Sequence, residues 1–375
     1  MSTLKNKILS LRKEAGSHSP SISLLREKIP ELEIKVDACY LSNPYATDLF
    51  ISYMEDFLKK VSLKDMIQFY PALNTTIAEH VAKSIEGDIT KDNIFVCNGA
   101  SEGIQAYLHN FVEGKILINI PTFSPYYEFV KEKSSIIYND NHSLKNIAKL
   151  IQERSIENVV IINPNNPDGT YISYKDLICF LKRFHYLQNI IVDESFIHFS
   201  YEDDSLKYSS LSKVVNTFKN LTIVKSMSKD FGISGIRAGY LLTDPSKVQY
   251  LLRNGYLWNI NSFSEMFFKI LAKESFQKSY KKCRTRYIQE TREFFKKLKS
   301  IHNINVTESK ANFVLIELPK GTDADDFAAR LLTESGVYVR SCNNKIGLGN
   351  NFIRVSSRTK EENEKIYEGL SKCLE

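Results

Sequence analysis

The chain lacks any apolar run that approaches the roughly 20 residues a membrane helix needs. Its first 20 residues, MSTLKNKILSLRKEAGSHSP, also have no apolar core long enough for a secretory signal peptide. We therefore expect a protein of the cytoplasm that has no membrane partner.

Cysteine pairs at metal-binding spacing are also missing. None of the six cysteines forms a CxxC unit, and the chain is neither small nor rich in cysteine. We interpret them as the reduced cysteines of a cytosolic enzyme and expect no metal site. They are Cys39, Cys97, Cys179, Cys283, Cys342 and Cys373.

A long basic block is absent as well. The net charge of +6 arises from 50 basic and 44 acidic residues that are spread along the chain. This distribution argues against a nucleic-acid partner. A mildly positive field suits an anionic substrate, although a solvated surface explains the same composition.

The chain has the size and composition of a two-domain globular protein. It contains 375 residues, of which 43% are hydrophobic and 25% are charged. Strand and helix patterns alternate from residue 90 to 240, which predicts an α/β fold with a mainly parallel sheet. We expect an N-terminal segment (1–45) that joins a small C-terminal domain (251–375), and a large domain between them (46–250).

The stretch 221–240, LTIVKSMSKDFGISGIRAGY, carries the strongest chemical signal. A buried strand at Leu221–Val224 runs into a polar loop that contains Lys229. Burial at a strand end lowers the pKa of a lysine, so its amine is more available to attack a carbonyl. Hydroxyls one and three residues before Lys229, and Arg237 after it, could hold a phosphate nearby. A lysine beside a phosphate cradle suits pyridoxal 5′-phosphate (PLP).

Ser-x-Ser-Lys alone favours a surface lysine on a glycine-rich loop. The longer string S-x-S-K-x-x-G-x-x-G-x-R-x-G-Y resembles the lysine motif of class I/II aminotransferases, the fold-type I enzymes that use PLP. The resemblance implies a seven-stranded-type sheet in the large domain and a smaller α+β domain. It also implies that Lys229 forms the Schiff base and that Ser226 and Arg237 bind the cofactor phosphate.

Two further strand ends extend this resemblance. The strand Ile94–Cys97 leads into a glycine-bounded turn and a helix start, where unpaired backbone N–H groups bind anions. The resemblance implies that Ala100 and Ser101 make the second phosphate contact there. It also implies that Phe123, past the next strand, stacks on the pyridine ring, whereas a lone aromatic residue there would be read as core packing.

The loop Asn163–Gly169 and the residues after strand 189–192 match the same family. N-P-x-N-P-x-G cannot continue a helix or a strand, and the resemblance implies that Asn166 donates to the phenolic oxygen of the cofactor. Asp193 is implied to pair with the protonated pyridine nitrogen, which makes the ring an electron sink. Phe196 departs from the tyrosine found in many aminotransferases, which puts standard transamination in doubt.

Two tyrosines are implied to lie at the substrate site and at a dimer contact. Leu41–Tyr45 reads as a turn with no room for helix. It resembles the N-E-N-P-Y segment of histidinol-phosphate aminotransferases, so Tyr45 is expected to line the substrate site. In the stretch Gln68–Pro71, Tyr70 is implied to reach the cofactor phosphate of a second subunit, which predicts a homodimer. A tyrosine that packs a turn is an equally plausible reading of Tyr70 alone.

The C-terminal third of the sequence indicates which branch of the class I/II aminotransferase family the chain resembles. Most of the chain resembles histidinol-phosphate aminotransferases, and short strings at Trp258–Asn261, Arg340–Cys342 and Arg354–Val355 resemble L-threonine-O-3-phosphate decarboxylases. That resemblance implies that Arg354 and Arg340 bind the substrate carboxylate and phosphate. Arg340 could instead pair with a surface carboxylate. The first 30 residues predict one or two amphipathic helices with a break at residues 16–20, which contains His18. The N-terminal HGGN string of those decarboxylases is absent, which leaves His18 a weak candidate.

We therefore predict a PLP-dependent homodimer that decarboxylates a small phosphorylated amino acid, O-phosphoserine or O-phosphothreonine, to the amino-alcohol phosphate. The alternative is an aminotransferase that acts on a phosphorylated substrate such as histidinol phosphate. A catalytically silent protein on this fold would be expected to lack Lys229 or Asp193, and both are present.

Overall fold

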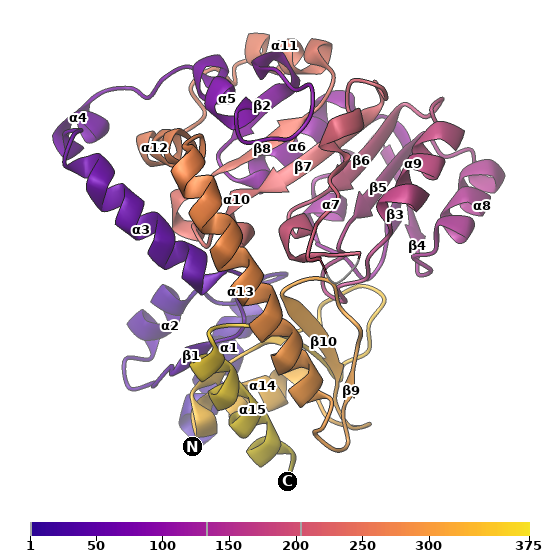
Figure 1. Ribbon diagram of the computed structural model, residues 1–375. Helices are drawn as coiled ribbons and strands as arrows, with labels where there is room; N and C mark the ends of the chain where they lie inside the picture. The colour runs from indigo at the N-terminus through magenta and orange to yellow at the C-terminus, as the bar shows by residue number, and fades with distance from the viewer. Residues whose placement is uncertain (1, 133, 203–204) are drawn as a thin grey trace. The chain divides into compact units, whose positions relative to one another are not determined.

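The computed structural model describes residues 2–132, 134–202 and 205–375, which form two compact units (Figure 1). The large unit comprises Ser42–Pro164 and Tyr171–Arg286. The small unit comprises the chain up to Leu41, the short segment Asn165–Thr170, and Tyr287–Glu375.

A seven-stranded sheet forms the centre of the large unit. Its strand order is β2-β8-β7-β6-β5-β3-β4, and only β8 runs antiparallel to its neighbours. The predicted α/β fold with a mainly parallel sheet is therefore confirmed. The strands are β2 (Ile94–Cys97), β3 (Gly114–Asn119), β4 (Ser134–Asn139), β5 (Asn158–Ile162), β6 (Asn189–Asp193), β7 (Leu221–Ser226) and β8 (Gly239–Leu242).

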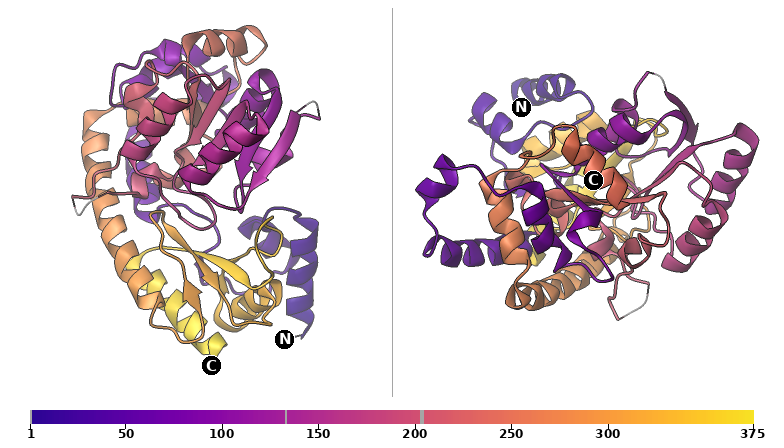
Figure 2. Two further views of the ribbon diagram at one scale, coloured as in Figure 1. Left: turned by 90° about the vertical axis from the view of Figure 1, so that its right-hand side faces the viewer. Right: turned by 90° about the horizontal axis from the view of Figure 1, so that it is seen from above.

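Helices cover both faces of this sheet (Figure 2). Alternate residues of the buried strands belong to two separate hydrophobic clusters, because successive side chains of a strand point to opposite faces. The helices are α3 (Pro44–Leu58), α4 (Leu63–Gln68), α5 (Asn74–Ala82), α6 (Ala100–Phe111), α7 (Pro125–Glu128), α8 (Leu144–Arg154), α9 (Tyr174–Arg183), α10 (Met227–Asp230), α11 (Pro245–Arg253), α12 (Ser262–Leu271) and the first half of α13 (Glu274–Leu298), with the 3₁₀ turns η1 (Lys91–Asn93), η2 (Ile197–Phe199), η3 (Leu211–Val214) and η4 (Ser234–Ile236).

The small unit contains an antiparallel sheet of order β12-β13-β10-β9 and a parallel pair, β1 with β11. One or two N-terminal helices with a break at residues 16–20 were predicted, and the structure has two, α1 and α2, with the break between them. The elements are α1 (Ser2–Glu14), α2 (Ile22–Lys28), β1 (Val36–Asp37), the second half of α13, β9 (Asn305–Val306), β10 (Phe313–Glu317), α14 (Ala324–Ser335), β11 (Val337–Tyr338), β12 (Arg340–Ser341), β13 (Phe352–Ser356) and α15 (Lys360–Leu374).

The expectation that Leu41–Tyr45 leaves no room for helix was wrong. Helix α3 begins at Pro44, so Tyr45 lies in its first turn. A proline is tolerated there because the first N–H groups of a helix have no intrahelical partner. Asn43 caps this helix, since its side chain accepts a hydrogen bond from the backbone N–H of Ala46.

The large unit also extends further along the chain than the predicted domain end at residue 250. It continues to Arg286 because α12 packs against α3 and α5, and its residues Phe267 and Phe268 are fully buried there. In the described part of the chain no helix is long and apolar enough to span a bilayer.

Candidate active site

The predicted cofactor residues of the large unit lie at one edge of its sheet. Cys97 pairs with Gly239, Gly239 pairs with Ser226, and the neighbouring β6 ends at Asp193. Strands β2, β6 and β7 run in the same direction, so their carboxyl ends meet at this edge. Ligands of open α/β sheets bind beyond that edge.

Lys229 lies in the four-residue helix α10, directly after β7. Ser226 caps this helix, because its hydroxyl accepts a hydrogen bond from the backbone N–H of Ser228 (3.3 Å). The carbonyl of Lys229 accepts a hydrogen bond from the backbone N–H of Asn43 (3.0 Å). The backbone is therefore held on both sides of Lys229, whose side chain is half-buried.

Arg237 and Gly99 form a cradle beside this lysine. A Cβ atom at Gly99 would lie 2.3 Å from Nη2 of Arg237, so only glycine leaves room for the guanidinium. Gly239 is similarly constrained, since a Cβ atom there would lie 2.7 Å from the backbone nitrogen of Ala100, the first residue of α6. The Ser228 hydroxyl is buried and has no hydrogen-bond partner among the described residues. A guanidinium, a helix start and an unpaired hydroxyl together fit a phosphate group.

Asp193 is buried at the end of β6 and accepts hydrogen bonds from Tyr126 and Ser195. Its Oδ2 accepts from the Tyr126 hydroxyl (2.8 Å) and its Oδ1 from the backbone N–H of Ser195 (2.8 Å). Burial raises the pKa of this carboxyl, and the hydrogen bonds oppose that shift. A carboxylate held in this way fits a cationic ring nitrogen. Sequence reasoning assigned no role to Tyr126, whose loop it had identified.

Replacing Tyr126 with phenylalanine is expected to weaken cofactor binding and lower kcat by about tenfold each. The substitution removes one hydrogen bond to a charged group, which contributes about 1.5–3 kcal/mol. Equilibrium titration of the apoprotein with PLP and steady-state kinetics would measure both effects. The matched control is Tyr127→Phe, next in the chain but half-buried, and unchanged affinity in Tyr126→Phe would contradict the assignment.

A second charged network lies next to Lys229 and was missed from the sequence. The Lys225 ammonium contacts Asp230, and Nδ1 of His198 lies 3.2 Å from the same carboxylate oxygen. Burial raises the pKa of Asp230 to about 6, and the charge of Lys225 opposes the shift. Burial, with the charges of Lys225 and Arg284, lowers the pKa of His198 well below its usual value. Lys225 lies inside the buried strand β7 (Leu221–Ser226), directly after the run Leu221–Val224, and a lysine at such a position was the signal that pointed to a buried partner.

Of the remaining predicted residues of the large unit, Tyr45 and Phe123 contact neighbouring side chains, and Tyr70 is exposed. The Tyr45 hydroxyl accepts from Arg286 (3.2 Å), whose guanidinium carbon lies 4.2 Å from the ring centroid. Phe123 packs edge-on against Tyr126, with centroids 6.5 Å apart. Tyr70 is 86% exposed.

In the small unit, the structure brings Arg354 and Asn166 together. Nη1 of Arg354 donates to Oδ1 of Asn166 (2.7 Å) and its Nη2 donates to the carbonyl of Cys39 (2.9 Å). The Nε–H of Arg354 is buried without an acceptor in the described structure. An unmet donor on a buried cation fits a carboxylate ligand. Because Oδ1 of Asn166 faces Arg354, the amide nitrogen of Asn166 is directed away from that guanidinium.

Arg340 is 4% exposed and has neutral acceptors only. It donates to the Ser17 carbonyl (2.6 Å), the Ser19 hydroxyl (3.1 Å) and Oδ1 of Asn344 (2.9 Å). Burial and the nearby Arg12 charge lower its pKa to about 10. No carboxylate of the described chain neutralises Arg340. The structure therefore does not contain the alternative considered from the sequence, an ion pair between Arg340 and a surface carboxylate.

Comparison with known proteins places this arrangement in a family. The family model for aminotransferase class I and II matches residues 43–370. The chain belongs to that family. It is 46% identical to an L-serine phosphate decarboxylase of Campylobacter jejuni, over 98% of this chain and 96% of that protein.

Two further relatives bear on the branch. A decarboxylase structure from Sulfurospirillum multivorans superimposes with a TM-score of 0.93 at 40% identity, covering 100% of this chain and 97% of that one. A histidinol-phosphate aminotransferase of Caldanaerobacter subterraneus is 30% identical over 76% of this chain and 79% of that protein. PLP is the cofactor of this family, and the cradle, Lys229 and Asp193 fit its phosphate, carbonyl and ring nitrogen.

Proposed function

We propose that this protein is a PLP-dependent decarboxylase that converts O-phospho-L-serine to O-phosphoethanolamine and CO₂, with O-phospho-L-threonine as a second substrate. The observation that carries the proposal is the 46% identity to an L-serine phosphate decarboxylase along nearly the whole chain. The two buried arginines of the small unit support it, because the substrate carries two anionic groups.

The proposed roles follow from the geometry. When bound, PLP supplies an electron sink for the pair released when a bond to the substrate Cα breaks. Arg354 binds the carboxylate through its unmet Nε–H and orients the Cα–carboxylate bond for cleavage. CO₂ then leaves, and Lys229, in its protonated ammonium form, donates a proton to Cα. Cofactor contacts are assigned to Ala100, Ser101, Phe123, Asn166, Asp193, Ser226 and Arg237, and substrate contacts to Tyr45, Asn166, Arg340 and Arg354.

Transamination of a phosphorylated substrate is the alternative, supported by the 30% identity to a histidinol-phosphate aminotransferase. Lys229 would then move the Cα proton instead of protonating Cα after loss of CO₂. Phe196 favours decarboxylation, since it lacks the hydroxyl that many aminotransferases have at this point.

The substrate is tested by incubating the holoenzyme with O-phospho-L-serine, O-phospho-L-threonine or L-serine, without any 2-oxo acid. We expect catalytic release of CO₂ from the phosphorylated amino acids and at least 100-fold slower release from L-serine, because Arg340 then has no anion to bind. Equal rates with L-serine would contradict the proposed phosphate requirement. Absence of CO₂ from all three would overturn the decarboxylase function.

We further propose that the enzyme is a homodimer in which Tyr70 reaches the partner's cofactor phosphate. Exposed apolar side chains support this proposal, since a contiguous apolar surface marks an interface. The Tyr70 and Trp258 rings lie 5.9 Å apart in this surface. Its members are Leu63 (47% exposed), Ile67 (70%), Phe69 (60%), Tyr70 (86%) and Trp258 (57%).

The dimer is tested by light scattering of wild type and Ile67→Glu. We expect a dimer for wild type and a shift toward monomer for the variant, because a charge would be buried without a partner. Lys64→Glu, an exposed neighbour in α4, is the control. A monomeric wild type would contradict the proposal.

We also propose a cytoplasmic location, which is supported by cysteines that are all unpaired in the structure. Fractionation of cells that express the protein would test this location.

A further inference from the structure

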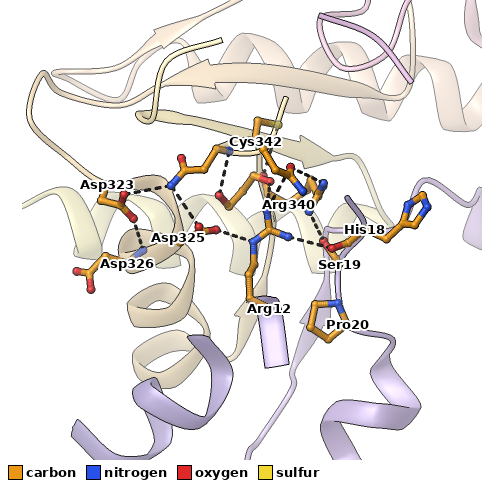
Figure 3. Close-up of polar contacts among 12 residues, drawn as sticks. Arg12, His18, Ser19, Pro20, Asp323, Asp325, Asp326, Arg340 and Cys342 are labelled. Carbon is orange, nitrogen blue, oxygen red and sulfur yellow. Dashed lines mark hydrogen bonds and ion pairs between the residues drawn. The ribbon is translucent and has the colours of Figure 1, made fainter. Parts of the chain in front are cut away.

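The Gly16–Pro20 turn between α1 and α2 is held by side chains from distant parts of the small unit (Figure 3). Three successive carbonyls of this turn each accept a hydrogen bond from a side chain. The carbonyl of Gly16 accepts from Asn344 (2.7 Å), that of Ser17 from Arg340 (2.6 Å) and that of His18 from Arg12 (3.1 Å). Two arginines and one asparagine therefore fix the path of the turn.

Arg12, near the end of α1, joins this turn to α14 and β12. Its Nε lies 2.5 Å from Oδ1 of Asp325, and its Nη2 donates to the Ser341 carbonyl (2.9 Å) and to Oδ1 of Asn344 (3.5 Å). The Arg12 side chain is 12% exposed. A guanidinium with partners on three segments orients them all, because its donors have fixed directions.

The two guanidinium groups share one neutral acceptor, Oδ1 of Asn344. Asp325 neutralises Arg12, while the partners of Arg340 are neutral. The cluster therefore keeps an excess positive charge in a largely buried place. A phosphate monoester dianion matches this charge better than a carboxylate does, since it offers more acceptor oxygens and a second negative charge.

The contacts of Arg340 also determine which of its donors remain for a ligand. Both Nη2 hydrogens are used, by Ser17 and Asn344, and one Nη1 hydrogen is used by Ser19. Within residues 2–132, 134–202 and 205–375, the Nε–H and the second Nη1–H have no hydrogen-bonded acceptor. They are the donors of Arg340 that remain for the oxygens of a phosphate group.

We propose that Arg12 is a positioning residue for phosphate recognition. Arg12 holds the Gly16–Pro20 turn and Asn344, which in turn fix Arg340 with its Nε–H and its remaining Nη1–H available to the substrate phosphate. The inference rests on the proposed function for the identity of the substrate. His18 contributes its carbonyl to this arrangement, and its ring points away from both guanidinium groups (Figure 3).

The test compares Arg12→Gln with Lys5→Gln. Lys5 forms a 2.5 Å ion pair with Asp326, so it also links α1 to α14, but it does not contact the turn. We expect Arg12→Gln to raise KM for O-phospho-L-serine by about 10- to 100-fold, which corresponds to one charge-assisted interaction. The expected change in kcat is less than about threefold. Lys5→Gln should keep wild-type values.

Binding measurements separate phosphate recognition from catalysis. Calorimetry should show a 10- to 100-fold weaker Kd of Arg12→Gln for O-phosphoethanolamine, which has a phosphate and no carboxylate. Affinity for L-alanine, which has a carboxylate and no phosphate, should be unchanged. Asn344→Ala, which removes the shared acceptor, should weaken O-phosphoethanolamine binding in the same direction and serves if Arg12→Gln does not fold.

Equal losses for both ligands, or no loss for O-phosphoethanolamine, would overturn the role of Arg12. So would a Lys5→Gln variant with the same defect, because helix docking would then explain the effect. A wild type that binds O-phosphoethanolamine in an Arg12-dependent way but releases no CO₂ would support this inference while contradicting the proposed function.

Discussion

Lys229→Ala is expected to lower the rate of CO₂ release from O-phospho-L-serine by at least about 10³-fold. The variant has no amine at the position that bonds to the cofactor carbonyl and donates a proton to Cα, and general acid–base catalysis alone contributes about 10²–10⁴-fold. The effect is measured under single-turnover conditions, so that slow product release does not mask it.

Three controls separate this loss from unfolding. The variant should retain PLP through dialysis, because the Arg237 cradle and Asp193 do not depend on Lys229. Borohydride should fix the cofactor covalently in wild type and not in the variant. Added methylamine should restore part of the activity, since a free amine can carry the proton. Activity within tenfold of wild type would rule out Lys229 as the catalytic lysine.

Lys225→Met is expected to destabilise the protein by about 3–5 kcal/mol. Methionine preserves the length of the side chain, but it leaves Asp230, which is 0% exposed, without its cationic partner. His198 contacts this carboxylate, and Arg284 and Lys229 also act on it electrostatically, but neither replaces the direct ion pair with Lys225. Thermal unfolding of the holoprotein measures the change, and Lys213→Met, which breaks an exposed ion pair with Glu86, should cost less than about 1 kcal/mol.

The destabilisation of Lys225→Met should depend on pH. The pKa of Asp230 is raised to about 6 in the folded protein. The contribution of Asp230 to the free energy of unfolding is therefore greatest when the pH is below the ordinary pKa of an aspartate, and it declines as the pH rises through 6. Removing the Lys225 charge raises this pKa further. The difference in the free energy of unfolding between wild type and Lys225→Met should therefore increase from pH 5 to pH 8. A gap that stays constant or narrows would show that Asp230 is not the group left unpaired.

Local sequence patterns predicted the sheet and the candidate catalytic lysine. Strand β2 has the predicted bounds Ile94–Cys97, because its apolar run stops at the glycine-bounded turn that follows it. The candidate Lys229 follows from a string of glycines, of which Gly239 leaves room for the start of α6. Such features are local, so they are readable without a fold.

Contacts between distant residues could not be read in this way. Tyr126 donates to a carboxylate 67 positions away, and Arg12 contacts residues more than 300 positions away. Nothing in a local window states which strand ends will be neighbours. The start of α3 at Pro44 was missed for a different reason, since an Asn-Pro pair favours a turn as readily as a capped helix start.

The most direct test of the account is a product balance with O-phospho-L-serine labelled with ¹³C at the carboxyl carbon. The account predicts one ¹³CO₂ and one O-phosphoethanolamine for each substrate consumed, over many turnovers, with no 2-oxo acid formed. It would be contradicted if a 2-oxo acid that retained the label appeared instead, together with conversion of the cofactor to its amine form. The enzyme would then be an aminotransferase.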